Sequence, residues 1–217
     1  MSSKGCKPNA ITYTTLIDGF SKAVHLQEAY DLVSEMSAKS LSLNIVGYNS
    51  LISALSKQGM IQQALEIFGD MSSNGCKPDI FTFNALILGF CKVDKMDEAL
   101  GTYRDIFLEG VIANVVTYNT LIHAFLRKGK IQEALKLVND MLFRGCPLDE
   151  ITYNGFIKAL CNDGAVERAI VLFEEMMRKG TKPNHVTCNI LINGFCRIGK
   201  VQNARVSERP DTSWIDT

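Results

Sequence analysis

The chain has no apolar run of roughly 18 residues, the length that a helix needs to span a bilayer. Its 217 residues carry no net charge, because 23 Lys and Arg balance 23 Asp and Glu. Any electrostatic attraction to a partner must therefore come from where the charges lie. The N-terminus shows no basic region followed by an apolar segment, and no Arg- and Ser-rich leader. We expect a soluble protein without a visible targeting peptide, which does not enter a membrane.

Signatures of catalysis and of metal binding are also missing. The sequence has no CxxC pair, no Gly-rich phosphate loop and no cluster of acidic residues with metal-ligand spacing. The three histidines, His25, His123 and His185, share no recurring place, and no His-Glu signature of a deaminase occurs. We therefore expect no enzymatic activity, no metal site and no other cofactor.

What the sequence does have is a seven-residue segment that recurs every 35 residues. Its clearest copy, Val-Thr-Tyr-Asn-Thr-Leu-Ile, begins at Val116. The other copies begin at Ile11, Val46, Phe81, Ile151 and Val186. A strict period indicates stacked modules, each too small to bury a core alone. The expected units are a partial repeat 1–9, whole repeats 10–44, 45–79, 80–114, 115–149 and 150–184, a partial repeat 185–204 and a divergent tail 205–217.

Each unit has the pattern of two helices joined by a short turn. Leu121, Ile122 and Phe125 mark the apolar face of a first helix, and a glycine such as Gly75, followed by a proline, predicts the end of a second helix. Five threonines are candidate N-caps of the first helices: Thr12, Thr82, Thr117, Thr152 and Thr187. A column of small residues suggests close contact between helices: Ala54, Gly89, Ala124, Ala159 and Gly194. Each unit is thus a helix-turn-helix hairpin.

Six of the seven cysteines fall into two columns of the repeat. One column holds Cys6, Cys76 and Cys146, and the other holds Cys91, Cys161 and Cys196. Equivalent places in neighbouring modules lie farther apart than the Cα separation that a disulfide allows. We expect small, mostly buried thiols in a reducing compartment.

Two polar columns follow the same period. The first contains Asn49, Asn84, Asn119, Asn154 and Asn189, with Thr14 in the first unit. An amide offers both a donor and an acceptor, which suits the edge of a nucleic-acid base; alternatively, these side chains cap a neighbouring hairpin or their own backbone. The second column contains Asn9, Asn44, Asp79, Asn114, Asp149 and Asn184. Its alternative interpretation is a turn residue between helices.

A basic row and an apolar row complete the pattern. The basic row, at the end of the first helices, consists of Lys22, Lys57, Lys92, Arg127 and Arg197, with Asn162 as the exception. Such a row suits a phosphate backbone, although cations are also favoured at the C-terminus of a helix. The apolar row consists of Ile11, Val46, Phe81, Val116, Ile151 and Val186. Without further information this row fits ordinary packing between modules.

A hairpin that begins Val-Thr-Tyr-Asn-Thr-Leu-Ile and ends Gly-Cys-Lys-Pro-Asp resembles the pentatricopeptide repeat. The likeness covers residues 1 to about 204 and is to the plain 35-residue P-class of plant organelle proteins, near the fertility-restorer-like group. It implies an all-α, right-handed α-solenoid (superhelix) that binds single-stranded RNA, one base per repeat. It further implies a monomer in the mitochondrion or chloroplast that takes part in RNA processing, stability or translation, with other RNA-processing proteins as possible partners. The editing and nuclease domains of some relatives are not visible.

The resemblance also assigns roles to the columns. The polar columns would read bases, the apolar row would sandwich them and the basic row would contact phosphates. Thr with Asn favours adenine, Asn with Asp favours uracil, and Asn with Asn favours a pyrimidine. The pairs are Thr14/Asn44, Asn49/Asp79, Asn84/Asn114, Asn119/Asp149 and Asn154/Asn184, with Asn189 lacking a partner. Read from the RNA 5′ end, they predict A-U-Y-U-Y.

Two alternatives to RNA binding are a protein-binding solenoid of the tetratricopeptide kind and an inactive truncated remnant. The tetratricopeptide period is 34 residues, and its Trp-x-x-Leu-Gly motif and late proline do not occur here. The sequence therefore favours RNA binding over a protein-binding scaffold.

Overall fold

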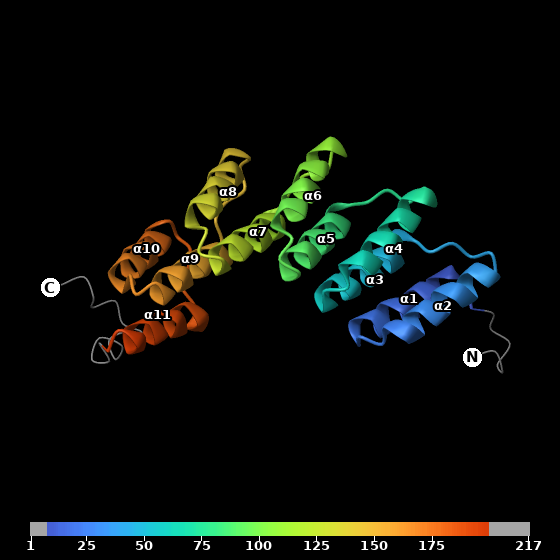
Figure 1. Ribbon diagram of the computed structural model, residues 1–217, viewed down its shortest axis with the longest axis horizontal. Helices are drawn as coiled ribbons and strands as arrows, with labels where there is room; N and C mark the ends of the chain where they lie inside the picture. Colours follow the sequence, from blue (N-terminus) through green and yellow to red (C-terminus); the bar gives the residue numbers. More distant parts are fainter. Residues whose placement is uncertain (1–7, 200–217) are drawn as a thin grey trace. The chain divides into compact units, whose positions relative to one another are not determined.

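The structure is a computed structural model that describes residues 8–199, which contain eleven helices and no strand (Figure 1). The helices are α1 (Ala10–Lys22), α2 (Leu26–Ala38), α3 (Ile45–Gln58), α4 (Ile61–Ser73), α5 (Ile80–Lys92), α6 (Met96–Leu108), α7 (Val115–Arg127), α8 (Ile131–Phe143), α9 (Glu150–Asn162), α10 (Val166–Arg178) and α11 (His185–Arg197). We call the odd-numbered helices first helices and the even-numbered ones second helices. Successive first helices begin 35 residues apart, as the period of the sequence predicts.

The first helices are capped by Asn or Asp, and the prediction that threonines cap them is wrong. Asp79 accepts hydrogen bonds from the backbone N–H groups of Phe81 and Thr82, both at 3.0 Å. Thr82 is the third helical residue, and its hydroxyl accepts from the N–H of Asp79 at 3.2 Å. The cap and the threonine thus satisfy each other's backbone groups, which a threonine cap could not achieve alone. Thr12, Thr117, Thr152 and Thr187 hold the same third position.

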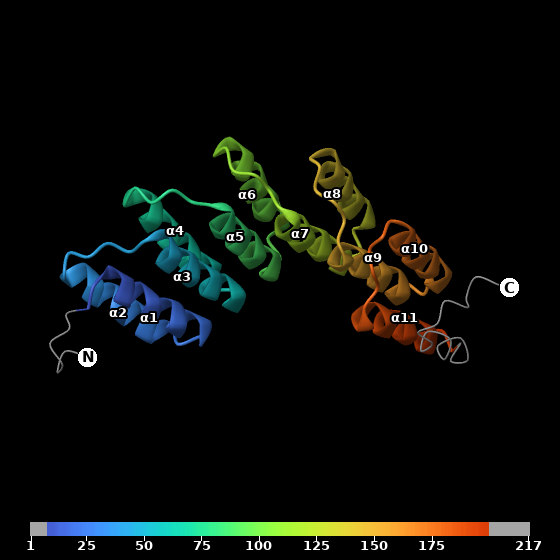
Figure 2. The ribbon, with the colours of Figure 1, turned by 180° about the vertical axis from the view of Figure 1, so that it is seen from behind.

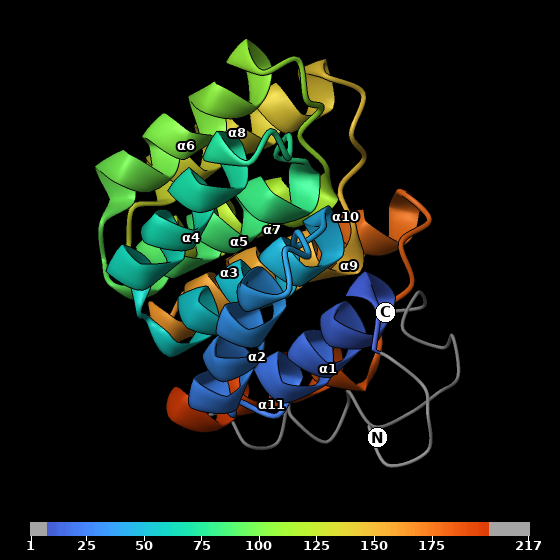
Figure 3. The same ribbon diagram turned by 90° about the vertical axis from the view of Figure 1, so that its right-hand side faces the viewer.

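The chain divides into two compact units, Met1–Leu121 and Ile122–Thr217, with the division inside α7. In the first unit, α3 packs between α1 and α5, and each first helix packs against the second helix of its own hairpin (Figures 1 and 2). The second helices α2 and α4 also contact the next first helix. In the described part of this unit, the Cα atoms of α2, α4 and α6 lie more than 8 Å from one another, and Figure 3 shows α4 and α6 on one side of α3 and α5.

Small residues allow the first helices to approach, as the column of Ala and Gly predicts. A Cβ atom on Gly89 would lie 2.7 Å from Cδ1 of Ile61 and 2.9 Å from Oγ of Ser56, which is closer than packed atoms tolerate. In the second unit, a Cβ atom on Gly194 would lie 2.6 Å from Sγ of Cys161. Any larger side chain at these two places would push neighbouring helices apart.

The core of the second unit lies among α9, α10 and α11. Tyr153, Ile157 and Cys161 of α9 pack with residues of the other two helices, Ala169, Met176 and Leu191. Apolar side chains spaced three and four residues apart on each helix therefore meet in one cluster, as helical periodicity requires.

Helix ends follow the predicted glycine closure. Gly75 and Gly180 have φ angles of +70° and +82°, a left-handed conformation that costs other residues energy. Each glycine follows the C-cap residue of a second helix, Asn74 or Lys179. The chain therefore turns back sharply at the end of α4 and of α10.

The cysteines are less buried than expected. Cys91 and Cys161 are buried, and burial raises the pKa of the Cys161 thiol. Cys76, Cys146 and Cys188 are half-buried, and Cys196 is exposed. The prediction of mostly buried thiols is therefore wrong for most of the cysteines in residues 8–199. Cys6, most of the partial repeat 1–9, the end of the partial repeat 185–204 and the tail 205–217 lie outside the described residues.

Candidate functional site

A groove of about 670 Å³ in the first unit brings residues from all the predicted columns together. Its lining includes both polar columns, the apolar row and the basic row. The members are Asn49, Asp79, Asn84 and Asn114, with Val46, Phe81 and Val116, and with Lys22 and Lys57. The helices that carry them are adjacent first helices, which explains why side chains 35 residues apart in sequence share one groove.

The pair Asn49/Asp79 is joined directly. Nδ2 of Asn49 donates to Oδ1 of Asp79 at 3.0 Å, and Oδ1 of Asn49 accepts from the hydroxyl of Thr82 at 2.5 Å. Asp79 also caps α5, so one carboxylate oxygen serves both the helix and the asparagine. The two predicted base-reading residues therefore form a single hydrogen-bonded unit with Thr82.

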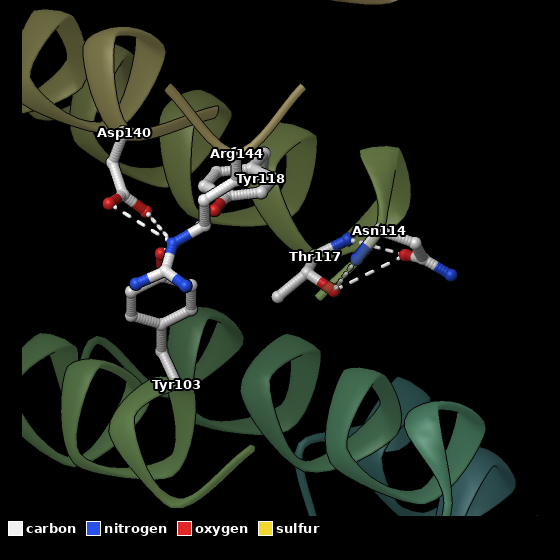
Figure 4. Close-up of polar contacts among 6 residues, drawn as sticks. All are labelled: Tyr103, Asn114, Thr117, Tyr118, Asp140 and Arg144. Atoms are coloured by element: carbon white, nitrogen blue, oxygen red, sulfur yellow. Dashed lines mark hydrogen bonds and ion pairs between the residues drawn. The ribbon is translucent and has the colours of Figure 1, made fainter. Parts of the chain in front are cut away.

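The pair Asn84/Asn114 repeats this arrangement. Nδ2 of Asn84 donates to Oδ1 of Asn114 at 3.2 Å, and Oδ1 of Asn84 accepts from the hydroxyl of Thr117 at 2.6 Å. Figure 4 shows Asn114 receiving hydrogen bonds from the backbone N–H and the hydroxyl of Thr117, at 3.1 and 3.2 Å. The adjacent Tyr118 is fully buried and accepts a hydrogen bond from Tyr103 at 3.0 Å, which anchors the start of α7 on α6.

The two pairs differ in the group that they leave for a ligand. All the hydrogen bonds that the carboxylate of Asp79 accepts in the described structure use Oδ1, so Oδ2 remains an acceptor. Asn114 also uses its oxygen for the cap and the neighbouring asparagine, so its NH2 group remains a donor. The second residue of one pair, Asp79, therefore leaves an acceptor, and the second residue of the other, Asn114, leaves a donor.

Two other predicted pairs are not joined within the described residues. Thr14 is buried, and its hydroxyl has no hydrogen-bond partner. Asn44 caps α3 through the N–H of Gly47 at 3.1 Å. Asn154 is buried with Oδ1 unpartnered, while Nδ2 of Asn184 donates to the carboxylate of Glu150. Thr14/Asn44 and Asn154/Asn184 thus differ from the pairs in the groove.

The remaining members of the polar columns have other surroundings. Asn119 is buried and Asn189 is exposed. Asp149 is half-buried and caps α9 by accepting from the N–H of Thr152 at 2.9 Å. Every described member of the second column therefore lies directly before the start of a first helix. This place agrees with the alternative interpretation of the column as turn residues between helices, and it does not exclude a role in base reading.

The residues of the apolar row are exposed to solvent. Ile11, Val46, Phe81, Val116, Ile151 and Val186 show 42% to 71% of their surface to solvent. Each is the second residue of a first helix. Packing between modules therefore does not account for them, because packing would bury them.

The basic row is exposed, and several of its members already make polar contacts. Lys22 forms an ion pair with Asp18 at 2.7 Å, Lys92 donates to the backbone oxygen of Lys57, and Arg197 donates to Oδ1 of Asn162 at 2.6 Å. The contact of Lys92 is the interaction expected of a cation at the end of a helix. Hydrogen bonds from Lys22 and Ser50 lower the pKa of Asp18, so its carboxylate remains charged at neutral pH.

Sequence reasoning missed three features of the site. Thr82 and Thr117 were assigned to caps, although their hydroxyls reach the asparagine of the preceding hairpin. Glu150 was not singled out, although it is the only acidic residue at the first position of a first helix. Asp18, which lines the groove beside Lys22, was also overlooked. The lone acidic residue in an otherwise apolar or neutral column was the available signal for Glu150.

Within residues 8–199, no helix is long and apolar enough to cross a membrane, and no group of three or more His, Cys, Asp or Glu could hold a metal ion.

Stacked hairpins that repeat the same side chains along adjacent first helices define the class of protein: an α-solenoid repeat protein. A family model described as "PPR repeat family" matches residues 43–92, 113–162 and 149–197. Two models described as "PPR repeat" match residues 4–37 and 81–111. These matches cover more than half of the chain, which belongs to the pentatricopeptide repeat (PPR) family.

Solved structures with the same fold include the pentatricopeptide repeat protein PPR10 in complex with an 18-nt psaJ RNA element. That structure is 25% identical with a TM-score of 0.82, and the match covers 93% of this chain and 30% of that chain. PPR10 from maize gives 28% identity and a TM-score of 0.73, covering 92% of this chain and 29% of that one. The expected all-α solenoid of helical hairpins is confirmed, and this chain spans less than a third of the length of PPR10.

The PPR domain of Arabidopsis thaliana protein-only RNase P 1, solved in complex with tRNA, shares the fold at 17% identity and a TM-score of 0.66. Here the match covers 87% of this chain and 96% of that domain. A comparison with curated proteins gave no match.

Proposed function

We propose that this chain is an adaptor that binds single-stranded RNA in a sequence-specific manner, one base per repeat, with a preference near A-U-Y-U-Y. The observation that carries the proposal is the groove of the first unit, where hydrogen-bonded polar pairs alternate with exposed apolar residues. Polar pairs supply donors and acceptors for base edges, and apolar side chains supply surfaces for base faces. The similarity to PPR10, solved with an RNA element, supports the same conclusion.

The free groups of the two pairs account for the difference between their expected bases. Uracil carries a donor at N3, which suits the remaining acceptor, Oδ2 of Asp79. Cytosine carries an acceptor at N3, which suits the remaining donor, the NH2 group of Asn114. The second base of the motif is thus uracil, and the third is a pyrimidine in which a cytosine is well accommodated.

Two further rows hold the RNA without selecting it. Exposed Val46, Phe81 and Val116 pack against the faces of successive bases, a contact that every base can make. Lys57, whose side chain has no other polar contact among residues 8–199, faces the same groove and pairs with phosphate. These rows supply affinity, and the polar pairs supply sequence preference.

The proposal extends to the cellular role by family resemblance. The chain is a P-class protein of the fertility-restorer-like plant group, and it acts as a monomer in a mitochondrion or chloroplast. There it influences processing, stability or translation of a transcript, alone or with other RNA-processing proteins. The proposed role of the groove is to hold RNA, because the described polar groups that line it form no acid–base or nucleophilic constellation.

A fluorescence anisotropy titration at low salt tests this function. The probe is a labelled RNA with A-U-U-U-C in an unstructured flank, and the controls are its DNA analogue and a purine scramble. Base contacts of about 1 to 3 kcal/mol each are partly offset by the cost of association, so we expect weak binding that is still selective. The expected result is at least about tenfold tighter binding of the RNA, or about 1.4 kcal/mol. Equal binding of all three probes, or none, would favour a protein-binding scaffold.

A further inference from the structure

We infer that Thr82 and Thr117 are positioning residues that fix the amide orientation of Asn49 and Asn84, and so set the base preference of the preceding repeat. The inference rests on the proposed function, since it concerns how the same groove distinguishes bases. It means that three residues determine each base contact in the groove. They are the asparagine, the Asn or Asp that pairs with it, and the threonine at the third position of the next first helix.

The hydroxyl groups are placed for this role. Thr82 and Thr117 are fully buried, and each reaches back across 33 residues to an asparagine oxygen, at 2.5 and 2.6 Å. A hydroxyl has only one proton. Thr82 lies 3.1 Å from Oδ1 of Asp79, so its shorter contact with Asn49 is the one that receives this proton.

The second contact of each asparagine completes the orientation. With Oδ1 of Asn49 on the Thr82 hydroxyl, Nδ2 must face Asp79, where it donates at 3.0 Å. A flipped amide would place its oxygen against the Asp79 carboxylate, two acceptors without a proton between them. The same holds for Asn84, because Oδ1 of Asn114 is fixed as an acceptor by the backbone N–H of Thr117.

The chain itself contains repeats in which this arrangement is absent. Gly47 stands at the place of the threonine, and the hydroxyl of Thr14 in the preceding hairpin is buried without a partner. Thr187 keeps its hydroxyl near Asn184, at 3.5 Å, and Oδ1 of Asn154 is buried without a partner. Within the described residues of each unit, direct pairing of the base-reading residues occurs where the threonine hydroxyl reaches the asparagine.

The consequence for recognition follows from the hydrogen bonds of the amide. In the fixed orientation, the second N–H and the second oxygen lone pair of Asn49 are available to a base, each at a fixed position. Without the Thr82 hydroxyl, only the contact of Nδ2 with Asp79 holds the amide, and the place of its oxygen is no longer fixed. Discrimination between uracil and cytosine at the second base therefore falls, although the pair Asn49/Asp79 is still present.

The experiment measures the dissociation constants of Thr82→Val for RNAs that carry U or C at the second base and, separately, at the third. Valine keeps the shape and the branching at Cβ but has no hydroxyl. We expect the U-to-C preference at the second base to fall about three- to tenfold, the range for one lost hydrogen bond. The preference at the third base stays unchanged, and Thr82→Ser, which keeps a hydroxyl, restores the second.

A matched control separates base positioning from helix capping. Thr12→Val removes a hydroxyl that contacts the cap residue Asn9 at 3.1 Å and, among residues 8–199, bonds no asparagine of another helix. It should lower the melting temperature of the chain without changing any base preference. A merely structural role of Thr82 would give the same result as this control.

The possible outcomes are distinguishable. An unchanged U-to-C ratio in Thr82→Val that still binds RNA would overturn the inference and leave the proposed function intact. Absence of RNA binding by the unmutated chain would overturn the proposed function, and the inference with it. If Thr82→Val does not fold, Thr117→Val is measured at the third base, and an unchanged ratio there overturns the inference equally.

Discussion

The two polar pairs in the groove of the first unit and the corresponding pair of the second unit have nearly the same residues but different hydrogen bonds. Asn84 donates directly to Asn114 at 3.2 Å. In the second unit, Asn184 donates instead to the carboxylate of Glu150, and Asn154 has a buried, unpartnered oxygen. Identical residue types therefore produce a joined pair in one place and a separated pair in the other.

The neighbour at the start of the first helix explains the difference. Glu150 is the first residue of α9, and the equivalent residues of α3 and α5 are Ile45 and Ile80. An isoleucine cannot accept a hydrogen bond, so the NH2 group of Asn114 stays free while its oxygen accepts from Asn84. The charged Glu150 instead holds the NH2 group of Asn184 and draws that side chain towards itself. Base preference thus depends on a residue outside the polar columns.

The largest effect is expected when the two joined pairs are made alike. Asp79→Asn replaces the free acceptor of the first pair with the free donor that Asn114 presents. The preference for uracil over cytosine at the second base should fall by about tenfold or more, since a good base contact contributes about 1 to 3 kcal/mol to discrimination. Anisotropy titrations with U and C at that base measure it.

Stability serves as the control for this variant. Asparagine is as good an N-cap as aspartate, so the melting temperature of Asp79→Asn should stay close to that of the unmutated chain. A retained uracil preference in a folded variant would contradict the assignment of Asp79 to the base edge.

A smaller effect is expected when the helix-start residues are exchanged. Ile80→Glu should draw the amide of Asn114 away from Asn84 and lower discrimination at the third base, about three- to tenfold for one lost hydrogen bond. Glu150→Ile should have the opposite effect at the fifth base, because it releases Asn184. Dissociation constants for RNAs with each of the four bases at these positions measure both changes.

Charge is controlled separately in this exchange. Glu150→Gln removes the negative charge but keeps an oxygen that can hold Asn184, so it should strengthen binding of all RNAs without sharpening the fifth base. If Glu150→Gln and Glu150→Ile behave alike, the carboxylate acts through its charge alone. The hydrogen bond from Asn184 to Glu150 would then not explain why the two pairs differ in base preference.

The smallest effect on base preference is expected from the charges of the groove, which should act on every RNA alike. Lys57→Ala should weaken binding evenly and lower the slope of log affinity against log salt by about 0.7 for one lost phosphate contact. Asp18→Asn should strengthen binding evenly, because the contacts of Asp18 with Lys22 and Ser50 lower its pKa and keep the carboxylate charged at neutral pH. A salt titration with two RNA sequences checks both, and a change in base preference would speak against a phosphate role.

The paired helices could be predicted from the sequence because the apolar spacing of each hairpin is local and is repeated. The start of each first helix could not be predicted from Thr82 alone, since Asp79 lies three residues earlier and is an equally good cap. The structure selects Asp79 because Thr82 then returns a hydrogen bond to the backbone of the cap. Only the reciprocal hydrogen bonds between Asp79 and Thr82 show that Asp79, and not Thr82, is the N-cap.

The polar columns could be predicted because residues one period apart occupy equivalent places on adjacent hairpins. The bond between Asn49 and Thr82 could not, because it joins two helices whose separation depends on the close contact that Gly89 permits. The burial of Thr14 and the diversion of Asn184 to Glu150 depend on the same three-dimensional contacts. A period identifies the members of a column but not the partner of each member.

The most direct test of base reading by these pairs is Asn49→Thr, titrated against RNAs that carry each of the four bases at the second position and, as a control, at the third. By family resemblance, threonine opposite Asp79 favours guanine. The account predicts that the preferred second base changes from uracil to guanine while the third base keeps its preference. A second base that remains uracil, or a change of equal size at both positions, would contradict it.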